Sequence, residues 1–266
     1  MKKIKRMLRQ EFPLIYGYLV NIKKKAQINK FKKKFPGTFI VKNLNNVLYS
    51  QENQDFIVYN NFFKEKKGVF CDIGGNHPLN INNTRYFQDI GWDGYVFEPL
   101  PQMKHLWQEY RPDAKLFPFA LSDTEGEVVF SIVENETGWE DMLSFIKETR
   151  DAEYKYETTD IVVQTRIFRD VCKEEGIAHI DYMSIDVEGH ELNVLKGIDF
   201  DEVKINVLTI ENNSEPNRVN GDDRIRRIML ENNYIFWGRI VDLDDIYVHR
   251  DFYNESNLKH NKPIWC

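Results

Sequence analysis

The sequence predicts an α/β domain built on a mostly parallel β-sheet. Three observations lead to this fold class. Short apolar segments typical of buried strands alternate with amphipathic helical segments, and such alternation favours parallel strands joined by right-handed crossovers. Several of the apolar segments end in a carboxylate. The first of them also leads into a Gly-rich turn, Asp72-Ile73-Gly74-Gly75-Asn76.

Length and composition agree with a single large domain. The chain has 266 residues, of which 42% are hydrophobic and 29% are charged, so it can bury a sizeable core. Its three cysteines, Cys71, Cys172 and Cys266, have neither metal-binding spacing nor an even number. A reducing compartment is therefore expected. No apolar run approaches the length of about 20 residues that a membrane span needs.

Charge is unevenly distributed along the chain. Residues 1–35 hold 12 Lys or Arg and one acid, a net charge of +11, whereas the whole chain carries −6 and residues 36–266 therefore carry −17. This basic arm predicts either peripheral contact with an anionic lipid or acidic glycolipid, or a solvated helix that packs on the domain. The acidic body argues against nucleic acid. We expect a cytoplasmic protein, with contact at the inner membrane face as one alternative.

The first half of the domain contains four expected strands and two helices. Each strand is an apolar run bounded by turn residues, and each helix has apolar residues at three-to-four spacing. The expected strands are Gly68–Ile73, Gly94–Glu98, Lys115–Ala120 and Val128–Val133. The expected helices are Asn82–Ile90, closed by Gly91, and one that begins at Pro101 and stops before Pro112. Residues 134–160 are polar without clear periodicity and are expected to form an irregular lid or loop.

The second half continues the alternation. A helix capped by Thr165 and ended by Gly176 comes first. Strands are expected at Tyr182–Val187, Asn206–Glu211, Tyr234–Ile240 and Ile246–Arg250, the last two as an antiparallel pair, and helices at Glu191–Lys196 and Asp222–Glu231. No linker divides this body. We expect an extension over residues 1–46, helical or irregular, a domain over 47–252 and a tail over 253–266.

The Gly-rich turn predicts an adenosyl cofactor. A small turn lets a ligand approach the backbone, and Glu98 at the end of the next strand can accept the ribose hydroxyls. The turn lacks the third glycine of the dinucleotide fingerprint. Asp72 before the turn would repel phosphate but suits the cationic S-adenosylmethionine.

The strongest further chemical signal is Asp186-Val187-Glu188-Gly189-His190. Ligands bind at the carboxyl ends of parallel strands, and alternation places Asp186 and Glu188 on one side of the strand end. Two carboxylates and an imidazole can act as a general base with its partners or as ligands of a divalent cation.

These segments resemble the FkbM family of S-adenosylmethionine-dependent methyltransferases. The resemblance rests on FCDIGGNHPLN, GWDGYVFEP, FALSD, YMSIDVEGHELNVLKGIDF and LTIENN, and it covers roughly residues 47–250. It implies a class I methyltransferase (Rossmann-like) fold, in which a seven-stranded, mostly parallel sheet has helices on both faces. It also implies O-methylation of a sugar hydroxyl in a glycan, glycolipid or glycosylated product.

We assign hypothetical roles on this basis. Asp72, Gly74, Asn76 and Glu98 would contact the methionine and ribose parts of the cofactor, with Ser122 and Asp123 beside the adenine. Asp186 and Glu188 would face the acceptor hydroxyl, with His190 as the base or its relay. Glu211 and Asn212 would bind other sugar hydroxyls, and His77 is an alternative base or a shaping residue. Trp139 and Phe145 could stack on the sugar.

Three alternatives remain open. A divalent metal held by Asp186, Glu188 and Glu211 is conceivable but not favoured. The Asp186-Val187-Glu188 pair also resembles the acid pair of metal-dependent glycosyltransferases, although this alternative leaves the Gly turn and Glu98 unexplained. A degenerate fold that serves as a membrane-bound scaffold would have no cofactor affinity. The oligomeric state and the acceptor are not determined by the sequence.

Overall fold

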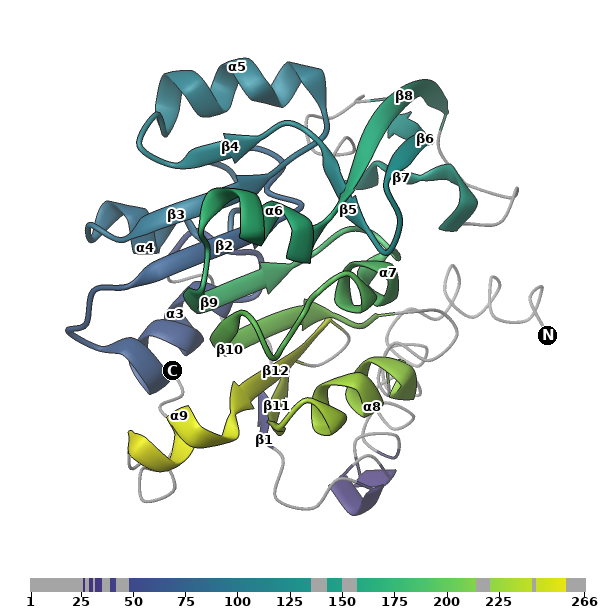
Figure 1. The fold of residues 1–266 in the computed structure, drawn as a ribbon. Coiled ribbons are helices and arrows are strands. Elements are labelled where there is room, and N and C mark those ends of the chain that lie inside the picture. Colours follow the sequence, from purple (N-terminus) through teal and green to yellow (C-terminus); the bar gives the residue numbers. More distant parts are fainter. Residues whose placement is uncertain are drawn as a thin grey trace, which may run out of the picture.

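In the computed structural model, eight strands form one mixed sheet. The model describes residues 26, 29–30, 32–34, 39–41, 48–134, 143–149, 157–213, 221–240 and 243–256. Within these residues the strand order is β1-β11-β12-β10-β9-β2-β3-β4 (Figure 1). Their bounds are β1 Phe39–Val41, β2 Val69–Ile73, β3 Asp93–Phe97, β4 Lys115–Phe117, β9 His179–Ile185, β10 Lys204–Glu211, β11 Tyr234–Ile240 and β12 Asp244–His249.

The expectation of seven strands is therefore wrong by one. Strands β10, β9, β2, β3 and β4 run parallel, whereas β12 is antiparallel to both of its neighbours, β10 and β11. The additional strand is β1, which pairs in parallel with β11. It comes from the segment 1–46 that was expected to lie outside the domain. Most of the basic arm, residues 1–35, lies outside the described residues.

A second, four-stranded sheet was not predicted. Its order is β5-β8-β6-β7, with β5 Ala120–Ser122, β6 Gly126–Val133, β7 Phe145–Ile146 and β8 Thr158–Ile167. The expected strand Lys115–Ala120 is divided, because Pro118 has no N–H for a ladder and the chain crosses there from one sheet to the other. Thr165 is not a helix cap: it lies in β8 opposite Ala120 and Gly126, and the helix α6 begins at Phe168.

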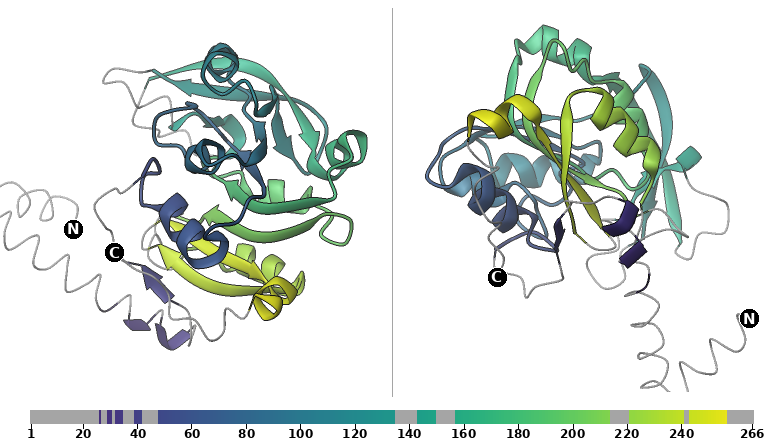
Figure 2. Two further views of the ribbon diagram at one scale, coloured as in Figure 1. Left: turned by 90° about the vertical axis from the view of Figure 1, so that its left-hand side faces the viewer. Right: turned by 90° about the horizontal axis from the view of Figure 1, so that it is seen from below.

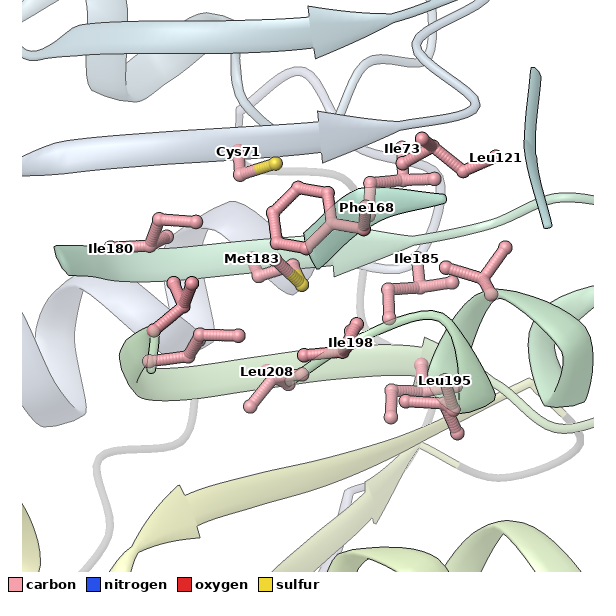
Figure 3. Close-up of a cluster of buried hydrophobic side chains, with 14 of the residues drawn as sticks. Cys71, Ile73, Leu121, Phe168, Ile180, Met183, Ile185, Leu195, Ile198 and Leu208 are labelled. Atoms are coloured by element: carbon pink, nitrogen blue, oxygen red, sulfur yellow. The ribbon is translucent and has the colours of Figure 1, made fainter. Parts of the chain in front are cut away.

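Helices cover both faces of the main sheet (Figure 2). One face carries α6 Phe168–Glu175, α7 Glu191–Lys196 and α8 Asp223–Glu231, and the other carries α3 Gln54–Val58, the π-helix η1 Tyr59–Phe63, α4 Arg85–Asp89, α5 Pro101–Tyr110 and α9 Arg250–Glu255. The alternation of β2 separates the two cores: Cys71 and Ile73 pack in one, and Phe70 packs in the other. Figure 3 shows the first of these cores, with Phe168 of α6 over the strands. Among the described helices, none is long and apolar enough to cross a bilayer.

The register of the parallel strands aligns their carboxyl ends. Ile73 of β2 lies opposite Phe97 of β3 and Ile185 of β9, and Ile185 lies opposite Ile210 of β10. The residues that follow these four positions therefore meet at one edge of the sheet. They are Gly74, Glu98, Asp186 and Glu211.

Candidate active site

Two adjoining cavities open at this edge. The first cavity has about 530 Å³ of empty space and an apolar wall that includes Phe97, Leu121 and Ile146. The second cavity has about 650 Å³ of empty space, and amide and carboxylate side chains outnumber apolar ones in its wall. Four residues line both cavities: Gly74, Asn76, Asp186 and Glu188. Ligands bound in the two cavities would therefore lie next to each other at these four residues.

The Gly turn is packed against both neighbouring strands. Gly74 has φ +85°, and a Cβ there would lie 1.9 Å from the carbonyl oxygen of Asp186. The N–H groups of Gly74 and Gly75 both donate to the carbonyl of Phe97, at 2.9 and 3.3 Å. A Cβ on Gly75 would lie 2.7 Å from Val96. Glycine is therefore required at Gly74 by close approach to backbone and by conformation, whereas a Cβ at Gly75 would require the side chains of Val96 and Trp107 to shift.

Glu98 holds the backbone on the β3 side of the first cavity. It is only 4% exposed, and its two carboxylate oxygens accept N–H groups from Asn76 and Leu100, each at 2.7 Å. The carbonyl of Asn76 accepts the indole N–H of Trp107 at 2.7 Å. Asn76 Oδ1 is buried with no hydrogen-bond partner among the residues that the structure describes. It is an acceptor that a ligand in the cavity could use.

Asp72 borders the second cavity. It is 3% exposed, and its Oδ2 accepts hydrogen bonds from the Thr84 hydroxyl at 2.7 Å and the Asn82 amide at 3.2 Å. Burial raises the pKa of Asp72, while Thr84 and the charge of Arg111 act to lower it. These contacts explain why α4 is shorter than predicted: Asn82 and Thr84 turn inward toward Asp72, and the helix begins only at Arg85.

Three of the predicted carboxylates converge at the ends of β9 and β10. Oxygen atoms of Asp186, Glu188 and Glu211 lie within 4.8 Å of one another. Burial, followed by repulsion between the neighbouring carboxylates, raises the pKa values of Asp186 and Glu211 well above their ordinary range. Glu188 has φ +53°, so a left-handed turn carries its side chain at the strand end. Such a group can share a proton or bind a cation.

His190 lies on the side of the first cavity and does not line the second. It is 7% exposed, and its Nε2 lies 3.0 Å from the Ser122 hydroxyl. Its Nδ1 has no hydrogen-bond partner among the described residues. Burial lowers its pKa, which favours a neutral ring. Asp123 contacts α7 instead, through Asn193 at 3.1 Å and Lys196 at 3.6 Å.

Asn212 has its side chain occupied by the protein. Its Nδ2 donates to Asp245 at 2.8 Å and to the carbonyl of Asp222 at 3.2 Å, and its Oδ1 accepts the Asp222 N–H. Asp245 is fully buried between Arg226, at 2.9 Å, and Arg239, at 2.5 Å. The structure thus places Asn212 in a network that holds the end of β10, and not among the described residues that line the two cavities.

Two other predicted residues also have structural contacts. His77 Nδ1 accepts the N–H groups of Leu79 at 3.1 Å and Asn80 at 3.2 Å, so the ring closes the turn that follows the glycines. Phe145 is 4% exposed within β7. Trp139 lies outside the described residues.

Several residues of the site were missed by sequence reasoning. Gln51, Asn82 and Asn83 line the second cavity, and Ser144 lines the first. The Asn-rich run Asn80–Thr84 carries a signal, because Asn favours turns and helix caps over positions within a helix. Gln51 lies at the site because Asp55 accepts the N–H groups of the two residues before it, Tyr49 and Ser50. No local sequence pattern indicates this contact.

Comparison with known proteins assigns the chain to a family. The model of the methyltransferase FkbM domain matches residues 72–236, which is more than half of the chain. That segment begins at Asp72 and includes Glu98, Asp186 and Glu211. No curated protein and no solved structure gave a significant match. The chain belongs to the FkbM family of methyltransferases.

Proposed function

We propose that the protein is an S-adenosylmethionine-dependent O-methyltransferase that acts on a sugar hydroxyl of a glycan, glycolipid or glycosylated product. The observation that carries this proposal is the shared wall of the two cavities. A cavity suited to an adenosyl group and a polar cavity suited to an acceptor meet at Gly74, Asn76, Asp186 and Glu188. The family match supports methyl transfer and gives no support to the glycosyltransferase alternative.

The first cavity fits S-adenosylmethionine by three features of its own residues. Glu98 is a buried carboxylate at the strand end where ribose hydroxyls are held in such sheets. Asn76 Oδ1 is a buried acceptor without a protein partner among the described residues. The apolar wall formed by residues such as Phe97 and Leu121 can cover the adenine. Since His190 lines the first cavity and not the second, we assign it to orienting the bound cofactor, in place of the role of base or relay expected from the sequence.

The second cavity fits an uncharged acceptor rich in hydroxyl groups. Its described wall contains amides and carboxylates, such as Gln51, Asn83 and Glu188, and neither Lys nor Arg. Amide and carboxylate groups pair with hydroxyls, whereas a phosphate would be repelled by the carboxylates.

The residues at the shared wall would perform the reaction. When bound, S-adenosylmethionine supplies an electrophilic methyl group on a sulfonium. Methyl transfer is accelerated by alignment and by removal of the acceptor proton. Asp186 and Glu188 border both cavities, and burial raises the pKa of Asp186, which makes the ionised form of its carboxylate a stronger base than an exposed aspartate. Glu211, beside them, would share the proton or anchor the acceptor.

A turnover assay with separate binding measurements tests these roles. Wild type, Glu188→Gln and His190→Ala would be given methyl-labelled S-adenosylmethionine and a panel of glycosides and oligosaccharides. Glu188→Gln should lose about 100-fold or more in turnover with cofactor affinity retained. His190→Ala should chiefly raise the cofactor KM. The exposed Glu109→Gln is the control.

Loss of cofactor binding in Glu188→Gln would contradict its assignment to the acceptor. Labelled methyl transfer to none of the sugars, together with transfer to an amine or carboxyl acceptor, would overturn the acceptor class.

A further inference from the structure

Arg111, which immediately follows α5, is a buried charge to which neither the sequence nor the proposed mechanism gives a role. It is 4% exposed. Its guanidinium lies over the rings of Trp107, at 4.4 Å from the centroid, and Phe70, at 5.3 Å. Burial lowers the pKa of Arg111 to about 10, so it remains charged at neutral pH. Keeping such a charge inside the protein is costly unless it is bound on several sides.

The guanidinium is bound by three side-chain oxygens. It donates to Asn82 Oδ1 at 2.8 Å, to Thr84 Oγ1 at 3.1 Å and to Gln88 Oε1 at 2.6 Å. The first two of these side chains are the same ones that donate to Oδ2 of Asp72. Arg111 and Asp72 are thus joined by two parallel relays, one through an amide and one through a hydroxyl.

The direction of these relays follows from the chemistry of arginine. A guanidinium can only donate hydrogen bonds. Asn82 must therefore turn its oxygen toward Arg111 and its NH₂ toward Asp72. Thr84 must accept from Arg111, which leaves its hydroxyl hydrogen for Asp72 or for Asn82 Oδ1. Both relays accordingly favour the ionised carboxylate of Asp72 as acceptor.

The same amide also fixes the Gly turn. Asn82 Nδ2 donates to the carbonyl of Gly75 at 3.0 Å. Trp107, one helical turn before Arg111, donates to the carbonyl of Asn76. The end of α5 therefore contacts the turn directly through Trp107 and indirectly from Arg111 through Asn82.

We propose that Arg111 is a positioning residue for the cofactor-binding turn, acting through Asn82 and Thr84 to keep Asp72 ionised beside the wall that the two cavities share. The inference rests on the proposed binding of S-adenosylmethionine in the first cavity: Asp72 lines the second cavity next to Gly74 and Asn76 of the shared wall, and from there its negative charge would attract the cationic ligand. If Arg111 had a structural role alone, replacing it would affect the stability of the fold. In the proposed role, replacing it also changes the protonation of Asp72.

Other charged or titratable groups also face Asp72. Tyr182 of β9, Asp186 after the end of β9 and the neighbouring Cys71 interact with it electrostatically. The thiol and the phenol have pKa values raised by burial and stay neutral near pH 7. Among the described residues that shift the pKa of Asp72, Arg111 is the one positive charge.

Two measurements on matched variants test the proposal. Arg111→Met removes the charge, Arg111→Lys keeps the charge without the planar fork, and Thr84→Val removes one relay. Arg169→Met removes an exposed arginine on α6 and is the control. The pKa of Asp72 is measured in the ligand-free protein by NMR of ¹³C-labelled aspartate. The Kd for S-adenosylmethionine is measured by calorimetry from about pH 5.5 to about pH 8.5, on the basic side of the ordinary aspartate pKa, because burial raises the pKa of Asp72.

Arg111→Met should raise the pKa of Asp72 by about one unit. It should weaken cofactor binding about tenfold at the acid end of the range and less at the basic end, because a protonated Asp72 loses its attraction for the ligand. Thr84→Val should shift the pKa in the same direction, Arg111→Lys should lie between Arg111→Met and wild type, and Arg169→Met should match wild type.

An unchanged Asp72 pKa in Arg111→Met would overturn the proposal, as would a loss of affinity that is equal at every pH. If Arg111→Met does not fold, Arg111→Lys and Thr84→Val decide by the same criteria. If wild type does not bind S-adenosylmethionine, the proposed function fails, and the Asp72 pKa still decides on Arg111.

Discussion

Replacing Glu98 by Gln should be far more damaging than an isosteric change suggests. Both carboxylate oxygens of Glu98 accept backbone N–H groups, from Asn76 and Leu100, at 2.7 Å. A glutamine side chain has a single oxygen, so its NH₂ group must point at one of these donors. One buried N–H then loses its acceptor, and the remaining bond loses its charge.

The expected cost follows from these two contacts. A buried donor left without a partner costs about 1–3 kcal/mol, and a hydrogen bond to a charged group contributes about 1.5–3 kcal/mol. Because Glu98 is only 4% exposed, water cannot replace the lost acceptor. We therefore expect the free energy of unfolding to fall by about 2–3 kcal/mol. The affinity for S-adenosylmethionine should fall about tenfold or more, since the amide also replaces an acceptor for the ribose hydroxyls.

Urea unfolding followed by tryptophan fluorescence gives the first quantity, and calorimetry gives the second. Glu109→Gln, a half-exposed change on α5, should leave both within error. An unfolding free energy for Glu98→Gln within about 0.5 kcal/mol of wild type, the range of a neutral surface substitution, would refute the role of Glu98 in holding the turn.

Three further perturbations test other parts of the structure. Gly74→Ala places a Cβ 1.9 Å from the carbonyl oxygen of Asp186 at φ +85°, so we expect a loss of at least about 2 kcal/mol; a thermal midpoint equal to wild type would contradict this. Asp245→Asn breaks the buried pair with Arg239 and should cost about 3–5 kcal/mol in chemical denaturation, so a loss below about 1 kcal/mol would be inconsistent with the network. Burial raises the pKa of Asp244 to about 7, above about 3.9 in an unfolded chain, so the folded state binds the proton more tightly. Stability contributed by this proton should be present below about pH 4 and lost as pH rises through about 7, by at most about 4 kcal/mol. Asp244→Asn should flatten the profile of unfolding free energy against pH over that range, and parallel profiles for the two proteins would contradict the assignment.

The edge of the sheet where the site lies could be predicted from the sequence, because parallel strands bring their carboxyl ends together. The carboxylates that end separate apolar runs, Glu98, Asp186 and Glu211, do meet at one edge, next to Gly74. The helix Glu191–Lys196 and the strand Tyr234–Ile240 also have the predicted bounds. These features depend on local periodicity and on one general rule of strand order.

The remaining features depend on contacts between residues distant in the sequence. Thr165 satisfies the pattern of a helix cap, but pairing with Ala120 takes it into a strand. Arg111 precedes a proline at a helix end and carries no signal, because its partners lie 27 and 29 residues away. Asn212 follows a strand as a ligand-binding residue would, yet its amide is bound to Asp245. Local patterns predict where a polar residue lies within an element. They do not predict the partner that its side chain contacts.

The same limit explains the unpredicted small sheet. The chain leaves the main sheet after β4, at Pro118. The next segment, Ala120–Ser122, pairs with β8, which begins at Thr158. Residues of this sheet and its connections, including Phe130 and Ile146, form the outer wall of the first cavity. The sequence predicts Phe130 in a strand, Val128–Val133, and Ile146 in an irregular segment, because the pairing that brings these strands together joins residues distant in the sequence.

Calorimetric titration of the wild-type protein with S-adenosylmethionine and its demethylated product tests the central claim most directly, with Glu98→Ala as the matched variant. We expect one site with a Kd of about 1–100 μM, or about −8 to −5.5 kcal/mol, for each ligand, lost in the variant. No binding of either ligand to the folded wild type would contradict the assignment of the first cavity to the adenosyl cofactor, and with it the proposed function.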